Sequence, residues 1–240
     1  MQTEGAVLAV VQARMSSSRL PGKVLAPILG RPMILRQLER IGRAETLDAV
    51  VVATSVEPSD DPLADALAAA GVAAHRGPLD DVLARFGEAV AAFEAAQGPV
   101  AHVVRLTGDC PLIDPALIDA AIRRHVDSGA DYTSNAFDRS YPDGLDVEVA
   151  TRGTLERLMR ECAAPEEREH VTLGLARRRG AFRVEQLVQP VDQSRLRWTV
   201  DTPDDLAFAR RVYAALYPEN PAFSSQDVHA LGPDFVRLAD

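Results

Sequence analysis

Apolar residues along this chain form short runs that alternate with segments of helical periodicity. The run at residues 6–12 is almost entirely apolar, as in a parallel strand that is buried on both faces. In residues 32–43, apolar side chains instead recur every three or four positions, as on one face of a helix. This alternation predicts an α/β fold with a mixed, mostly parallel sheet flanked by helices. No linker or repeat divides residues 1–240, which we expect to form one domain.

Turn and cap residues divide this pattern into individual elements. Predicted strands cover residues 6–12, 47–53, 72–75, 100–106, 182–189 and 195–200. Predicted helices cover residues 32–43, 61–71, 80–96, 114–129 and 202–216. Three of them begin with a capping residue before a proline, at Asp61–Pro62, Asp114–Pro115 and Thr202–Pro203. The rhythm breaks in a polar excursion at residues 136–190, with a hairpin expected within 131–150 and two helices rich in arginine and glutamate within 151–180.

Composition limits the classes of protein to which the chain can belong. Of its 240 residues, 47% are hydrophobic and 25% are charged, which excludes collagen-like, disordered and disulfide-scaffold proteins. The apolar run near the N-terminus is too short to span a bilayer, and Glu4 stands where a signal peptide carries basic residues. Two cysteines without CxxC spacing and a net charge of −9 lead us to expect a cytoplasmic protein that binds neither nucleic acid nor membranes.

The charge is unevenly distributed. Residues 5–38 contain no aspartate or glutamate, although an even spread would place about five there. The same segment contains five cations, at Arg14, Arg19, Lys23, Arg31 and Arg36. A cationic segment in an acidic protein is typical of a binding site for a small polyanion, the alternative being a solvated basic face.

The loop after the first predicted strand has the composition of a triphosphate site. Ligands of parallel α/β sheets bind beyond the carboxyl ends of the strands, which is where this loop begins. Its side chains include three hydroxyls and three cations, from Ser16, Ser17, Ser18, Arg14, Arg19 and Lys23. Hydroxyls and backbone N–H groups donate to phosphate oxygens, while cations neutralise the charge that grows during phosphoryl transfer. The loop lacks the GxxxxGK[ST] pattern of a P-loop, so a surface loop with incidental cations is the alternative.

Five segments carry a more specific signature. They are residues 12–25 (QARMSSSRLPGKVL), 105–112 (RLTGDCPL), 141–149 (YPDGLDVEV), 168–172 (REHVT) and 198–203 (WTVDTP). Together they resemble the CMP-sugar-acid synthetases, best known from the CMP-KDO and CMP-sialic acid synthetases, and most closely the spore-coat polysaccharide cytidylyltransferase branch. The resemblance implies a glycosyltransferase-A-like nucleotidyltransferase fold. It also implies an enzyme that joins CTP to a sugar acid and releases pyrophosphate, for cell-surface or spore-coat polysaccharide synthesis.

The resemblance and the positions in the chain also suggest roles for individual residues. The expected catalytic residues are Arg14, Lys23 and Asp109. The expected nucleotide-binding residues are Ala13, Arg14, Ser16, Ser17, Ser18, Arg19, Gly22, Lys23, Arg85 and Arg105. The expected acceptor-binding residues are Asp146, Glu148 and His170.

Two carboxylates support a magnesium site independently of the resemblance. Asp109 follows the predicted strand at 100–106, and Asp114 already caps the next helix. Asp201 follows the predicted strand at 195–200, and Thr202 is the better cap there. Because Mg²⁺ prefers carboxylate oxygens together with substrate phosphates, we expect Asp109 and Asp201 to bind it. A local turn hydrogen bond is the alternative for each carboxylate.

Several other candidates also have a purely structural interpretation. Alternation along the chain places Asp146 and Glu148 on one side of a strand, where they face the acceptor, a second metal or solvent. His170 belongs to a charged helix and can be a surface residue. Arg85 can be a solvated partner of Asp81, four residues earlier.

Two other functions stay open from the sequence. One is a glycosyltransferase of similar fold that consumes a nucleotide sugar, although no DxD triplet free of a capping role follows a predicted strand. The other is a non-catalytic nucleotide-binding protein.

The polar excursion leads us to expect a homodimer. The resemblance implies that relatives dimerise through such a segment, which extends to the active site of the partner subunit. The apolar contacts expected there come from Phe137, Tyr141, Leu158, Met159, Leu173 and Leu175. Packing of the excursion on its own sheet is the alternative.

Overall fold

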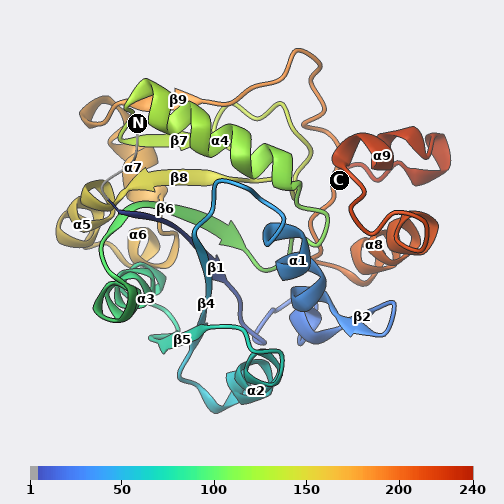
Figure 1. The fold of residues 1–240 in the computed structure, drawn as a ribbon, viewed down its shortest axis with the longest axis horizontal. Coiled ribbons are helices and arrows are strands. Elements are labelled where there is room, and N and C mark those ends of the chain that lie inside the picture. Colours follow the sequence, from blue (N-terminus) through green and yellow to red (C-terminus); the bar gives the residue numbers. More distant parts are fainter. Residues whose placement is uncertain (1–4, 240) are drawn as a thin grey trace.

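A mixed sheet forms the centre of the computed structural model, which describes residues 5–239 (Figure 1). Its seven strands lie in the order β5-β4-β1-β6-β8-β7-β9. Their bounds are β1 Ala6–Gln12, β4 Ala49–Ser55, β5 Ala74–Gly77, β6 Val100–Thr107, β7 Tyr132–Ser134, β8 Glu148–Thr151 and β9 Val184–Gln186. Strands β5, β4, β1 and β6 are parallel, β8 is antiparallel to β6 and β7, and β9 is parallel to β7. The predicted mostly parallel sheet is confirmed.

The helices and short strands fill the connections between these strands. The helices are α1 Met33–Ile41, α2 Asp61–Ala69, α3 Val82–Gln97, α4 Pro115–Ser128, α5 Arg152–Glu161, α6 Pro165–Glu169, α7 Leu173–Arg177, α8 Pro203–Leu216 and α9 Ser225–Ala230. A small hairpin pairs β2 Pro27–Ile28 with β3 Arg31–Pro32. Among residues 5–239, no helix is both long and apolar enough to cross a membrane.

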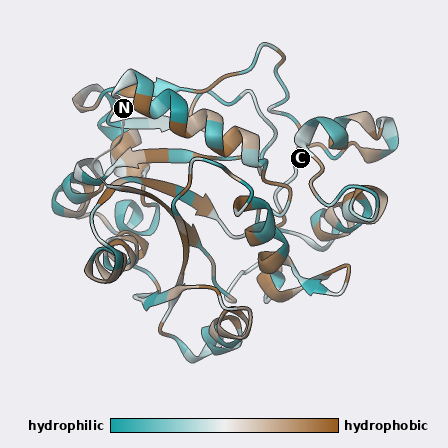
Figure 2. Ribbon diagram, in the orientation of Figure 1, coloured by the Kyte–Doolittle hydropathy of each residue, from teal (hydrophilic) through white to brown (hydrophobic). Residues whose placement is uncertain are grey.

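Alternation along β1 divides the apolar core into two layers. Val7, Ala9 and Val11 contribute to a core with side chains of α1, α2, α4 and α8. Leu8 and Val10 point to the opposite face and pack with side chains of α3 and α5. Figure 2 shows the apolar residues concentrated in the central strands, while the helices carry polar residues on their outer sides. Burial on both faces explains why β1 is almost entirely apolar.

Two of the three predicted helix caps are confirmed. The Asp114 carboxylate accepts a hydrogen bond from the Ala116 N–H, and α4 ends at Gly129 in the left-handed conformation. Thr202 caps α8 in a capping box with Asp205. The third cap is wrong, because Asp61 is the first residue of α2 and not its cap.

Two further element predictions need correction. Residues 151–180 form three short helices, α5, α6 and α7, where two were expected. Residues 195–200 form no strand of the sheet. Their backbone crosses between two turns instead: the Trp198 N–H donates to the Asp143 carbonyl, and the Val200 N–H donates to the Asp109 carbonyl. Carbonyl groups in these turns accept the hydrogen bonds that a neighbouring strand would otherwise accept.

The polar excursion packs partly on its own sheet. Leu158 and Leu175 are buried in the core layer that contains α3 and α5, so they cannot supply contacts to a second copy. That part of the predicted interface is wrong. Phe137 and Met159 are partly buried against the same layer.

Candidate active site

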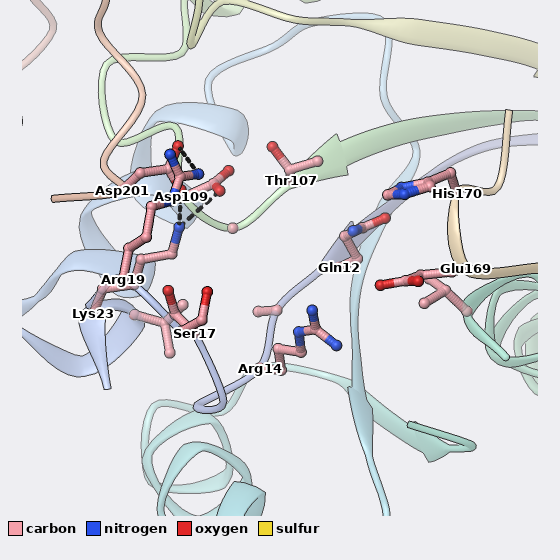
Figure 3. A pocket seen from close by; sticks show the side chains of 15 residues that line it. Gln12, Arg14, Ser17, Arg19, Lys23, Thr107, Asp109, Glu169, His170 and Asp201 are labelled. Carbon is pink, nitrogen blue, oxygen red and sulfur yellow. Dashed lines mark hydrogen bonds and ion pairs between the residues drawn. The ribbon is translucent and has the colours of Figure 1, made fainter. Parts of the chain in front are cut away.

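A cavity of about 350 Å³ lies at the carboxyl ends of β1 and β6, where the sheet topology places a ligand site. The loop after β1, the turn after β6, the end of α6 and the segment before α8 form its walls (Figure 3). The lining residues are Gln12, Ala13, Arg14, Ser17, Ser18, Arg19, Lys23, Val24, Val82, Thr107, Gly108, Asp109, Glu169, His170 and Asp201. Of the predicted site residues, Ser16, Gly22, Arg85, Arg105, Asp146 and Glu148 are not in this lining.

The loop after β1 is held in place by a buried carboxylate. Asp60 is fully buried, and its Oδ1 accepts a hydrogen bond from the Met15 N–H at 2.6 Å. Its Oδ2 accepts from the backbone N–H and the hydroxyl of Ser55 at the end of β4. The loop then folds back, so that the Gly22 N–H reaches the Met15 carbonyl, with Gly22 at a φ of 73° that favours glycine. Gly22 therefore shapes the loop without lining the cavity.

Lys23 is the centre of the charged end of the cavity. Its Nζ lies 2.9 Å from Oδ2 of Asp109, 2.8 Å from Oδ1 of Asp201 and 2.8 Å from the Val200 carbonyl oxygen. Burial alone would lower the pKa of Lys23, but the two carboxylates outweigh burial and raise it above its ordinary value. Lys23 therefore carries its charge at neutral pH, and the structure brings three predicted site residues together on one atom.

The two carboxylates differ in their other partners. Burial would raise the pKa of Asp109, but the Lys23 charge and a hydrogen bond from Thr107 lower it below its usual range. Asp201 is more strongly paired, because its Oδ2 lies 2.6 Å from Arg197 Nη2 and 2.9 Å from Arg19 Nη2. Both carboxylates thus accept hydrogen bonds from cationic side chains of the protein.

The turn after β6 approaches the end of β1 closely. The Gly108 N–H donates to the Gln12 carbonyl at 2.8 Å. A Cβ atom at Gly108 would lie 2.8 Å from the Cβ of Ala13 and 3.0 Å from the Gln12 carbonyl oxygen. Only glycine allows this contact, which brings Asp109 to the loop that carries Arg14 and Lys23.

Arg14 provides positive charge that the protein does not neutralise. It lines the cavity, and within residues 5–239 it makes no ion pair with a carboxylate. Figure 3 shows its guanidinium between the Ser17 and Glu169 side chains. An unpaired guanidinium on the cavity wall matches the oxygens of a phosphate.

The donor set at Asp109 and Asp201 fits a magnesium ion. Both carboxylates contact the Lys23 ammonium, so their oxygens already converge on one cation-sized position. No group of three or more histidine, cysteine or acidic side chains suited to a metal occurs in residues 5–239. Mg²⁺ needs no such cage, because it is usually held by one or two carboxylates together with substrate phosphates and water.

Arg105 and Glu148 do not line the cavity and form an ion pair with each other. Glu148 is buried and also accepts hydrogen bonds from the hydroxyls of Tyr132 and Thr172. Burial would raise the pKa of Glu148, but Arg105 and these hydrogen bonds lower it. Glu148 therefore does not face solvent, which was the alternative to its expected acceptor-binding role, and it does not line the cavity. Arg105 Nε also lies 3.2 Å from Oε1 of Gln12, so the pair contacts the cavity lining through that amide.

Arg85 and Asp146 also have partners of their own. Arg85 is buried and donates to the carbonyl oxygens of Pro78 and Leu79, so it is not a solvated partner of Asp81. Burial lowers its pKa. Asp146 is held by two hydrogen bonds from the Arg139 guanidinium, at 2.5 and 2.7 Å, and burial raises its pKa.

Several residues of the site were missed from the sequence alone. Among them, Asp60 anchors the loop after β1, while Gln12 and Glu169 line the cavity. Both Gln12 and Glu169 lie within the family-like segments, so their position beside Ala13 and His170 was an available signal. Nothing in the sequence distinguishes Asp60 from Asp61, because the contact to Met15 spans 45 residues.

Known proteins resemble this chain along nearly its whole length. The spore coat polysaccharide biosynthesis protein SpsF of Bacillus subtilis (strain 168) is 33% identical to it, over 94% of this chain and 93% of SpsF. The 3-deoxy-manno-octulosonate cytidylyltransferase of Anaeromyxobacter sp. (strain K) is 32% identical, over 87% of this chain and 98% of its own.

The fold and the family profile agree with these relatives. A cytidylyltransferase from Leptospira borgpetersenii serovar Hardjo-bovis (strain JB197) superposes with a TM-score of 0.91 at 29% identity, covering 99% of both chains. The profile of the cytidylyltransferase family matches residues 8–226, which confirms the resemblance and the nucleotidyltransferase fold expected from the sequence. The chain therefore belongs to the cytidylyltransferase family and is a nucleotidyltransferase.

Proposed function

We propose that this protein transfers the cytidylyl group of CTP to a hydroxyl of a sugar acid, giving a CMP-sugar and pyrophosphate. The observation that carries the proposal is the Lys23 ammonium, which lies between Asp109 and Asp201 at one end of a cavity whose wall holds the unpaired Arg14. The Anaeromyxobacter relative is named for a sugar-acid substrate, and SpsF is named for spore-coat polysaccharide synthesis. For this chain we propose a sugar acid as the acceptor and a role in surface polysaccharide synthesis.

The proposed reaction is an in-line displacement at the α-phosphate. An acceptor oxygen forms a bond to the α-phosphorus, and the bond to the bridging oxygen of the β-phosphate breaks. Pyrophosphate leaves with the electrons of that bond, and the acceptor hydroxyl loses its proton. The protein's part is to hold the phosphates with Arg14, Lys23 and the Ser17 hydroxyl, which stabilise the charge that moves to the leaving group.

Magnesium would enter this site through the two carboxylates. We propose Asp109 and Asp201 as its protein ligands, supported by their convergence on Lys23. A Mg²⁺ ion held there would neutralise negative charge on the phosphates. Lys23, which contacts both carboxylates, would donate to a phosphate oxygen.

We also propose a reducing cytoplasm and a homodimer. The compartment is supported by Cys110 and Cys162, which are both buried free thiols.

The dimer is supported by exposed apolar side chains beside the edge strand β9, Val188 at 54% and Val191 at 66% exposure. Light scattering at micromolar concentration tests it, and a monomer of about 26 kDa with full activity contradicts it.

Pyrophosphate release tests the reaction and its substrates together. Each of the four nucleoside triphosphates is combined with a panel of eight- and nine-carbon sugar acids in the presence of Mg²⁺. We expect release with CTP and only with an acceptor present. Consumption of CMP- or UDP-sugars without pyrophosphate release would instead indicate a glycosyltransferase, and tight CTP binding with no release would indicate a non-catalytic protein.

A further inference from the structure

The end of the cavity opposite Lys23 has a different chemistry from the charged end. Figure 3 shows Gln12, Glu169 and His170 at this end, while Lys23, Asp109, Asp201 and Arg19 gather at the other. If the proposed function is right, the phosphates of a nucleotide lie at the Lys23 end. The base of that nucleotide then extends across the cavity toward Gln12 and Glu169.

The protein fixes which atom of the Gln12 amide a ligand meets. Arg105 Nε, which can only donate, lies 3.2 Å from Oε1 of Gln12. The amide nitrogen Nε2 is therefore available to a ligand, because it makes no hydrogen bond in the described part of the chain. The ion pair with Glu148 in turn holds the Arg105 guanidinium in place. Gln12 thus offers the cavity a hydrogen-bond donor.

Glu169 is held beside the start of α3 by its neighbour in the sequence. The Arg168 guanidinium contacts both carboxylate oxygens of Asp81, at 2.9, 3.0 and 2.6 Å. Asp81 is also the N-cap of α3, and Val82, the first residue of that helix, lines the cavity. This ion pair joins the segment that carries Glu169 to the start of α3, and Glu169 and Val82 both line the cavity. Glu169 thus offers the cavity a charged acceptor.

We propose that Glu169 selects cytosine over uracil by accepting a hydrogen bond from the 4-amino group, while Gln12 Nε2 donates to the acceptor edge of the same base. Cytosine carries a donor at C4 and acceptors at N3 and O2. Uracil carries an oxygen at C4, which a carboxylate repels, and a donor at N3. A donor and a negatively charged acceptor therefore complement cytosine and oppose uracil.

Charge argues against the acceptor sugar at this end. A sugar acid brings a carboxylate, and Glu169 would place a second negative charge beside it. The neutral cytosine ring carries no such charge, and Val82 supplies apolar surface for it. The end that contains His170, which the sequence suggested for the acceptor, is therefore assigned to the base.

Nucleotide binding measured by calorimetry tests the proposal without turnover. The dissociation constants of CTP and UTP are compared, with Mg²⁺, for the natural protein, Glu169→Gln and Glu169→Ala. A hydrogen bond to a charged group contributes on the order of 10- to 100-fold in affinity. We expect both variants to reduce the preference for CTP over UTP by that factor, with Glu169→Gln also binding UTP more tightly because its amide can donate to O4.

Glu166→Gln is the matched control on the same helix. The Glu166 carboxylate contacts Arg177 at 2.5 Å and does not line the cavity, so the CTP preference should stay unchanged. An unchanged CTP preference in both Glu169 variants, or equal affinity of the natural protein for CTP and UTP, overturns the proposal. So does a Glu169 variant that loses only acceptor affinity. Failure of the natural protein to bind any nucleotide would instead contradict the proposed function itself.

Discussion

The Lys23 ammonium lies 2.9 Å from the Asp109 carboxylate, although 86 residues separate them in the sequence. Because the same ammonium also contacts Asp201, one lysine joins the phosphate loop to both proposed metal ligands. Lys23 is the cationic partner that the two carboxylates share, while Arg19 and Arg197 also contact Asp201. We therefore expect the proposed phosphate and metal sites to behave as one unit, in which a change to any of these three residues affects the other two.

Replacement of Lys23 by methionine keeps the length of the side chain and removes its charge. We expect K23M to lower the rate of pyrophosphate release by at least about 100-fold, as for loss of one transition-state donor. We also expect a loss of about 1–3 kcal/mol in the free energy of unfolding, because two carboxylates lose their shared partner. The Arg31→Ala variant is the control, since Arg31 is exposed and pairs with Glu39. A folded K23M with near-normal turnover would rule out the phosphate-loop assignment.

Metal binding should depend on the nucleotide. Two carboxylates are too few to hold a divalent cation tightly, so Mn²⁺ as a probe should bind weakly to the protein alone and more tightly once CTP supplies phosphate oxygens. Electron paramagnetic resonance of free Mn²⁺ measures both states. We expect Asp109→Asn and Asp201→Asn each to weaken the ternary complex by about 10-fold or more. The exposed Asp138→Asn serves as the control, and metal affinity unchanged in both site variants would disprove the assignment.

Gly108 tests the close approach between β1 and β6. Alanine there would place a Cβ 2.8 Å from the Cβ of Ala13, and the loop must shift to relieve the contact. We expect Gly108→Ala to lose about 1–3 kcal/mol in unfolding free energy and to weaken nucleotide binding. At Gly180, where nothing lies within 4 Å of an added Cβ, alanine should change neither quantity. Equal stability and affinity for the two variants would contradict the packing described.

A buried histidine pair far from the cavity should limit stability in acid. His125 Nε2 lies 3.1 Å from His102 Nδ1, and burial together with His102 lowers the pKa of His125 to about 4. In the unfolded chain this pKa is about 6.5. Protons therefore bind the unfolded state first, and stability falls as the pH drops from about 6.5 toward 4.

Urea unfolding measures this acid-dependent loss. The shift in the pKa of His125 corresponds to about 2 kcal/mol lost between pH 7 and pH 5. His125→Gln removes the titrating group, so its stability should fall less over the same interval. An equal fall in the natural protein and the variant would show that other groups control the acid limb.

The parts of the fold that were predicted correctly depend on neighbours in sequence. Each of these features follows from residues that are close together in the sequence. They are the apolar run of β1, the Asp114 cap and the Thr202 cap. The loop after β1 was singled out for the same reason, because its cations and hydroxyls lie within ten residues, and the structure places Arg14, Arg19 and Lys23 in the cavity lining. Local chemistry is therefore visible in the sequence even where its partners are distant.

The parts that failed depend on contacts between distant segments. Glu148 alternates like a solvent-facing residue, but Arg105, 43 residues away, pairs with it and makes its burial possible. Residues 195–200 have the composition of a strand, but turns at Asp109 and Asp143 take their backbone donors. Periodicity reports which side a residue faces and not which partner it meets there.

Phosphorus NMR of the complete reaction tests the central claim most directly. With CTP, Mg²⁺ and a sugar acid that supports turnover, the account predicts one new phosphodiester signal for each pyrophosphate released, and no CMP or CDP. Over the same reaction time, the mixture with K23M should show neither the phosphodiester signal nor pyrophosphate. Formation of CMP or CDP without a phosphodiester, or loss of CTP without pyrophosphate, would contradict cytidylyl transfer by this protein.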